Sequence, residues 1–143
     1  MDAKKAREFY LEYLNTIYTE RKVDQLGRFF ADDVIAHPAV PGTPPGLRGV
    51  QAIVQGWVEA FSDLRFTLDG FIYEKDMMAP RVTMSGTQIG TFLGIPPAGK
   101  RFQIVDHPHY QLRDGKVVVI WDSPDMLTLL QQLGAIPALT LAV

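Results

Sequence analysis

The chain has 143 residues, of which 47% are hydrophobic and 21% charged, with a formal net charge of −2, which suits a single globular domain spanning residues 1–143 rather than a disordered chain. The basic residues are scattered, which argues against nucleic acid as a partner, and the absence of cysteine excludes disulfides and thiolate chemistry. No apolar run approaches the length of a membrane span, so we expect a cytoplasmic protein with no membrane partner.

The first part of the sequence predicts three helices, a brief strand and a loop. Apolar residues recur at intervals of three and four between residues 3 and about 18, which predicts an α-helix with one apolar face. Asp24 is suited to cap a shorter helix, and the brief strand VIAHP follows it and stops at Pro38. Residues 38–46, PAVPGTPPG, are too rich in Pro and Gly to be regular. Helical spacing returns in residues 50–61.

The second part of the sequence predicts a sheet and a last helix. Strand-length apolar runs, separated by breaker-rich stretches, cover residues 64–74, 80–90, 101–112 and 116–121. The last helix begins near Ser123, a candidate N-cap that precedes Pro124, and it ends at Gly134. Helices followed by a run of strands indicate an α+β domain, with helices gathered on one face of a mostly antiparallel sheet.

Three segments together carry a resemblance to a known family. They are SGTQIGTFLGIPPAGK at 85–100, DGKVVVIWD at 114–122 and LLQQLG at 129–134. From its first helix to Gly134 the sequence resembles the SnoaL-like polyketide cyclases of the NTF2-like superfamily. The resemblance implies a cone, in which a strongly curved sheet wraps around the N-terminal helices and encloses a deep pocket. It also implies a homodimer formed through the sheet.

The resemblance also implies a chemistry. Family members close a ring by an intramolecular aldol reaction without a metal or organic cofactor, and an Asp near the end of the last strand serves as acid and base. In this chain that residue is Asp122. The family places a His on the cavity face two residues after the position of Asp106, where this chain has Pro108 between His107 and His109. Either the proline breaks the strand and turns one His inward, or Asp106 takes over part of the work of the His.

The hairpin turn at residues 113–115 decides which side chain accompanies Asp122. A two-residue turn would place His107 opposite Asp122. A three-residue turn with Gly115 as a left-handed bulge residue would place Asp106 there and turn both histidines to the other face. The sequence favours the three-residue turn, because glycine in the third loop position is what such hairpins require.

Asp122 is the first candidate for catalysis. Because Ser123 is suited to cap the last helix, Asp122 is free for another role, and burial among apolar strand residues would raise its pKa toward neutrality. A buried carboxyl at Asp106 would share one proton with it. His107 is the third catalytic candidate. His107 and His109 have ligand-like spacing, but a metal site needs at least a third ligand, so we predict no metal.

Six further residues are candidates for substrate binding: His37, Gln88, Trp57, Tyr10, Tyr110 and Ile120. Each has a plainer interpretation. His37 would bond to the adjacent loop at the end of its strand, Gln88 would face outward from its strand, and the aromatic residues would belong to the core.

These observations favour an enzyme that acts as a small-molecule cyclase or isomerase. Asp122 would remove a proton next to a carbonyl of a hydrophobic, polyketide-like or terpenoid-like substrate, and no cofactor is expected. One alternative is a ligand-binding or dimeric assembly module of the same fold without catalysis. A second alternative is a hydrolase in which water is activated between Asp106 and Asp122. The expected partners are the hydrophobic small molecule and a second copy of the chain.

Overall fold

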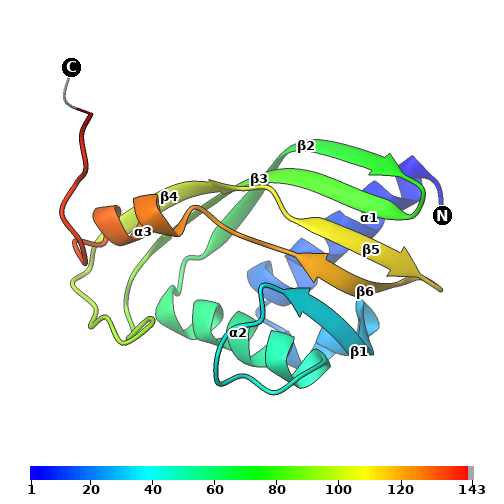
Figure 1. The fold of residues 1–143 in the computed structure, drawn as a ribbon, viewed down its shortest axis with the longest axis horizontal. Helices are drawn as coiled ribbons and strands as arrows, with labels where there is room; N and C mark the ends of the chain where they lie inside the picture. The colour runs from blue at the N-terminus through cyan, green and yellow to red at the C-terminus, as the bar shows by residue number, and fades with distance from the viewer. Residues whose placement is uncertain (142–143) are drawn as a thin grey trace.

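The computed structural model describes residues 1–141 and confirms the predicted α+β architecture (Figure 1). Within these residues, one curved sheet has the strand order β1-β6-β5-β3-β2, with β4 paired to β3. Figure 1 shows α1 behind β2, β3 and β5, with α2 beside β1 and α3 beside β4. The elements in chain order are α1 (Ala3–Leu14), η1 (Asn15–Thr19), η2 (Val23–Arg28), β1 (Phe30–His37), α2 (Leu47–Ala60), β2 (Arg65–Glu74), β3 (Met77–Thr87), β4 (Arg101–Asp106), β5 (His109–Arg113), β6 (Lys116–Trp121) and α3 (Met126–Gln132).

The predicted first helix is present, but its last turn changes form. Asp2 caps α1 by accepting a hydrogen bond from the Lys5 backbone N–H at 2.8 Å. From Asn15 the chain continues as the π-helix η1, and the Glu20 N–H donates to the Asn15 carbonyl, five residues back, at 2.8 Å. Apolar periodicity does not reveal such a turn, because the helix face it continues stays apolar.

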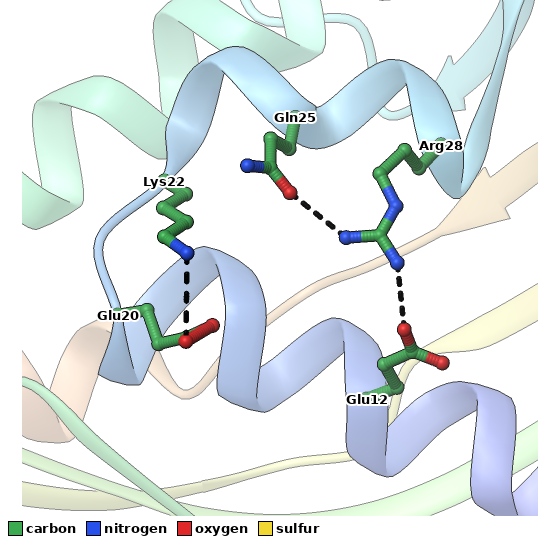
Figure 2. Close-up of polar contacts among 5 residues, drawn as sticks. All are labelled: Glu12, Glu20, Lys22, Gln25 and Arg28. Carbon is green, nitrogen blue, oxygen red and sulfur yellow. Dashed lines mark hydrogen bonds and ion pairs between the residues drawn. The ribbon is translucent and has the colours of Figure 1, made fainter.

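Polar contacts of Arg28 lie within η2 and between η2 and the first helix (Figure 2). Arg28 donates to Glu12 Oε1 at 2.7 Å and to Gln25 Oε1 at 2.8 Å. Such exposed pairs contribute less than about 1 kcal/mol each, so they orient the segment rather than hold it. The helix η2 is a 3₁₀ helix without a side-chain cap. Asp24 lies in its first turn, so its predicted role as the N-cap is wrong.

Two strands begin earlier than predicted. β1 starts at Phe30 and pairs in parallel with β6. β3 starts at Met77, after a turn in which Lys75 and Asp76 both have positive φ. The prediction began that strand at Pro80, because proline is normally confined to strand starts and edges. In the structure Pro80 lies inside a central strand.

The predicted strand 101–112 is divided in two. β4 and β5 pair with β3 in a single register, in which Val82 lies opposite Asp106 and Met78 opposite Tyr110. That register brings Pro108 level with Pro80, and neither residue has an N–H to give to the ladder. The break between β4 and β5 therefore follows from two prolines that face each other.

The turn between β5 and β6 is the two-residue one, so the favoured prediction of a three-residue turn is wrong. Arg113 pairs with Lys116. Asp114 and Gly115 have φ values of 51° and 78°, and a type I′ turn requires positive φ at both positions. Asp114 meets this requirement at the first position of the turn. The sequence-based prediction had placed only Gly115 in the left-handed region.

A β-bulge in β6 corrects the register after this turn. The pairing shifts by one residue at Val118, and one inserted residue exchanges the two faces of the strand beyond it. Asp106 is therefore buried on the inner face, while His107 and His109 are exposed. This division of faces is the one that the favoured prediction expected, although it arises from a different irregularity.

The helix α3 closes the free edge of β4. Asp125 caps it by accepting hydrogen bonds from the Thr128 N–H at 3.2 Å and the Thr128 Oγ1 at 2.7 Å, so the prediction of Ser123 as the cap is wrong. Gln132 Oε1 accepts from the Gln103 N–H at 2.7 Å, which covers an edge that would otherwise be open. In residues 1–141 the structure contains no helix with the length and apolar character needed to cross a membrane.

Candidate active site

A cavity of about 40 Å³ lies between the first helix, α2 and the inner face of the sheet. This volume accommodates two or three water molecules. Its wall combines carboxyl and phenol groups with aromatic and apolar side chains. The lining residues are Tyr10, Tyr13, Leu14, Tyr18, Trp57, Phe66, Met84, Asp106, Tyr110, Asp122 and Pro124.

Two carboxyl groups meet in this wall. Asp106 ends β4, is only 4% exposed, and accepts a hydrogen bond from the His107 N–H at 2.9 Å, which the strand break has left free of the ladder. Asp122 follows β6, and its backbone N–H donates to the His37 carbonyl at 2.9 Å. The side chains of Asp106 and Asp122 line the same cavity, and Asp106 is close enough to raise the pKa of Asp122. Because the register past the bulge brings Pro108 level with Asp122, the two acids meet diagonally across the strands.

The environment of Asp122 keeps it neutral near pH 7. Burial, followed by the proximity of Asp106 and the charge of that neighbour, raises the pKa of Asp122 from 3.8 to about 9. The pair therefore holds a proton at neutral pH. Asp122 Oδ1 is buried and has no hydrogen-bond partner in the described part of the chain. Asp122 lines the cavity, so this oxygen is the candidate atom for exchanging a proton with a bound molecule.

Four tyrosines surround the carboxyl pair. Burial is the main cause that raises the pKa of Tyr10, Tyr13, Tyr18 and Tyr110 above its ordinary value, so these phenols, which are neutral at pH 7 in water, stay neutral to higher pH and are able to donate. The hydroxyls of Tyr13 and Tyr18 lie 3.3 Å apart, and the rings of Tyr10 and Tyr110 pack with their centroids 5.5 Å apart. Sequence reasoning did not select Tyr13 and Tyr18, because both fit the apolar face of an ordinary helix.

A comparison with known protein families identifies the family of this chain. A family model described as SnoaL-like polyketide cyclase matches residues 4–133. The chain belongs to this family. No curated protein matches the chain.

Solved structures resemble this SnoaL-like protein over almost all of its length. TsrD from Streptomyces laurentii is 30% identical, covers 95% of this chain and 99% of its own, and has a TM-score of 0.86. A SnoaL-like polyketide cyclase from Agrobacterium tumefaciens is 27% identical, with coverages of 94% and 100% and a TM-score of 0.75. AclR from Streptomyces galilaeus, at 24% identity, coverages of 95% and 100% and a TM-score of 0.81, shows the fold alone.

The cavity of the SnoaL-like protein brings together five of the predicted site residues. Asp106, Asp122, Trp57, Tyr10 and Tyr110 all line it. The acids were found from the sequence because they interrupt apolar strands, and the aromatic residues because the family fold encloses a pocket.

The structure places the histidines of this SnoaL-like protein away from the cavity. His107 and His37 are exposed, and His37 stacks on Trp121 with 5.9 Å between the ring centroids. The strand breaks at Pro108 as one alternative proposed, but neither His107 nor His109 turns inward. The predictions that His107 and His37 lie in the pocket are therefore wrong. In residues 1–141 no group of three or more potential metal ligands gathers.

Two other predicted substrate-binding residues of the SnoaL-like protein lie away from the cavity and support the fold. Ile120 belongs to the hydrophobic core and does not border the cavity. Gln88 is 1% exposed, and its Nε2 donates to the carbonyls of Gly90 at 3.0 Å and Ile95 at 2.9 Å. It therefore neither lines the cavity nor faces outward. Its side chain holds the start of the 88–100 loop.

Proposed function

We propose that this protein is a cyclase or isomerase that moves a proton next to a carbonyl group of a hydrophobic substrate. The observation that carries the proposal is the buried carboxyl pair, which holds one proton and presents the unpartnered Oδ1 of Asp122 to an aromatic cavity. A carboxyl group whose pKa is raised by burial is a stronger base than an exposed one, which suits the removal of a weakly acidic proton from carbon.

The proposed reaction begins with proton transfer to Asp122. The shared proton moves toward Asp106, Asp122 Oδ1 takes a proton from the carbon next to the substrate carbonyl, and the C–H electron pair shifts to form an enolate. In ring closure the enolate carbon attacks a second carbonyl of the same molecule, and Asp122 returns its proton to the new alkoxide. In isomerisation the proton returns to another carbon. No oxidant or metal is needed to balance either step.

The size of the cavity sets a condition on this proposal. Pockets for ligands of drug size usually measure about 300–1,000 Å³, whereas this cavity measures about 40 Å³. A ring-shaped substrate therefore requires the aromatic wall to part. Trp57 and Phe66 are partly exposed lining residues, and we propose that they move aside on binding.

The experiment for the proposed function is hydrogen exchange at carbon. β-Tetralone, a small bicyclic ketone with acidic hydrogens next to its carbonyl, is incubated with the protein in deuterated water and followed by NMR. We expect the wild type to accelerate exchange and Asp122→Asn to reduce that acceleration by about 10²–10⁴. Asp63→Asn, which changes an exposed carboxyl that does not line the cavity, is the control. Full acceleration by Asp122→Asn would refute the proposal.

A ligand-binding module without catalysis is the second candidate function. It is favoured by Pro108, which occupies the position where the resemblance implies a His. In this case the protein would bind β-tetralone without accelerating exchange, and Asp122→Asn would leave the dissociation constant unchanged.

A further inference from the structure

We propose that the phenols of Tyr13 and Tyr18 form an oxygen-binding subsite, set by the π-helix η1, that holds the carbonyl oxygen of the ligand across the cavity from Asp106 and Asp122. This inference rests on the proposed function only in its assumption that the ligand carries a carbonyl group. It adds two residues to the site, and it gives the distortion of the helix a role.

The π turn is what brings the two phenols together. In a regular α-helix the side chains that meet are three or four residues apart, whereas Tyr13 and Tyr18 are five apart. The π-helix bonds each N–H to the carbonyl five residues back, so side chains with that spacing come onto one face. The hydroxyls of Tyr13 and Tyr18 lie 3.3 Å apart, and both residues line the cavity. π turns are uncommon and often lie at functional sites.

The phenol pair has a hydrogen-bond donor to spare. Two hydroxyls carry two hydrogens, and one of these is used in the bond between Tyr13 and Tyr18. In residues 1–141 neither hydroxyl has a further hydrogen-bond partner. A phenol is neutral at pH 7, and burial raises the pKa of both tyrosines further, so the second hydrogen is retained at neutral pH. A ligand oxygen in the cavity is the acceptor that this hydrogen lacks.

The surrounding rings hold the two phenols in position. Tyr18 packs on Phe66 with ring centroids 4.2 Å apart, and Tyr13 packs on Phe29 and Phe30 at 5.7 and 5.4 Å. The hydroxyls are therefore fixed by ring packing, which a change to phenylalanine preserves. Tyr13 and Tyr18 line the same cavity as Asp106 and Asp122, so the phenols and the carboxyls face one space. A ligand between them would meet a proton acceptor on one side and a donor on the other.

Infrared spectroscopy of bound β-tetralone, isotopically labelled at its carbonyl carbon, tests the subsite. Hydrogen bonding to a carbonyl oxygen lowers its stretching frequency, so we expect a band at lower frequency in the wild type. Tyr18→Phe and Tyr13→Phe should each lose most of this shift and raise the dissociation constant about two- to tenfold, the effect of one neutral hydrogen bond. Tyr73→Phe removes an exposed phenol that bonds to Asp76 and the Met1 carbonyl, and it should match the wild type.

The outcomes separate this inference from the proposed function. If the band and the affinity are unchanged in both Tyr18→Phe and Tyr13→Phe, the subsite does not exist, even if exchange at carbon still requires Asp122. If the wild type at saturating β-tetralone shows no shifted band, the inference also fails. If the phenols are required for the shift but the wild type accelerates no exchange, the subsite stands and the enzymatic proposal falls. Unchanged thermal unfolding of the phenylalanine variants shows that they remain folded.

Discussion

Burial determines the ionisation of the side chains around the cavity. It raises the pKa of Asp122 from 3.8 to about 9, so that this carboxyl keeps its proton at neutral pH, and it moves the pKa of the four tyrosines further above neutrality. Each protonated group is a donor, and Asp122 can also accept. The cavity is consequently an environment in which an oxygen that gains negative charge is stabilised by donors already in place.

The raised pKa of Asp122 predicts how stability depends on pH. The folded chain holds a proton on Asp122 up to about pH 9, whereas the unfolded chain releases it near pH 3.8. The stability from this group is therefore complete below about pH 3.8 and is lost as pH rises through about 9. Asp122→Asn, which mimics the protonated side chain, should change the melting temperature little at pH 4 and raise it by on the order of 5 °C at pH 9. A variant with the same pH dependence as the wild type in calorimetry would show that Asp122 is not the group responsible.

The site residues differ in how far the sequence could reveal them. Asp106 and Asp122 were predictable, because a charged side chain in an apolar strand needs a partner or a function. Tyr18 was not, because its position depends on a π turn that leaves no mark on apolar spacing. The pocket role of His107 depended either on a two-residue turn without a later register shift or on an inward turn at Pro108, and the sequence decides neither the bulge in β6 nor the direction of a broken strand.

The hairpin of β5 and β6 contains a tight turn and a separate β-bulge, which the sequence-based prediction treated as a single feature. The prediction from sequence placed a single extra residue in the turn itself. In the structure the turn is tight and the extra residue is Val118, within the strand. The two arrangements give the same faces, because either one changes the register by an odd number of residues. Element order and fold class were predictable at this scale, whereas pairing geometry was not.

Alanine substitutions of two glycines, one in the tight turn and one in α2, should have opposite effects on stability. Gly115 has a φ of 78° and open space around its Cβ position, so Gly115→Ala should destabilise by about 1–2 kcal/mol through backbone strain alone. Gly56 lies inside α2 and also has open space. Gly56→Ala should therefore stabilise by about 0.5–1 kcal/mol. Denaturant unfolding of both variants measures the two effects, and a loss of stability in both would mean that the turn is not the cause.

At the scale of the whole molecule, the inner and outer faces of the sheet have different chemistry. All three histidines of the chain, His37, His107 and His109, are exposed. Large apolar side chains lie exposed in the same strands, including Ile35 at 54%, Val105 at 44% and Trp121 at 40%. Apolar patches rimmed by polar residues often mark sites of association. We propose that this outer face joins two copies of the chain.

The proposed dimer predicts a change of mass when the outer face is charged. Val105→Arg introduces a charge into the centre of a self-complementary contact, where it would meet its own copy, so the variant should elute as a monomer in light-scattering chromatography. Leu127→Arg changes a similarly exposed apolar residue on α3 and should remain a dimer. A wild type that is monomeric at micromolar concentration would contradict the proposal.

The two tryptophans of the chain divide between these faces. Trp57 borders the cavity, and Trp121 is exposed at the end of β6. Under selective excitation, the tryptophan fluorescence of a Trp121→Phe variant would come from Trp57 alone and follow entry of a molecule beside the carboxyl pair. A Trp57→Phe variant would emit from Trp121 and follow contact at the outer surface. The chain therefore carries its own optical reporter for ligand binding and a separate one for self-association.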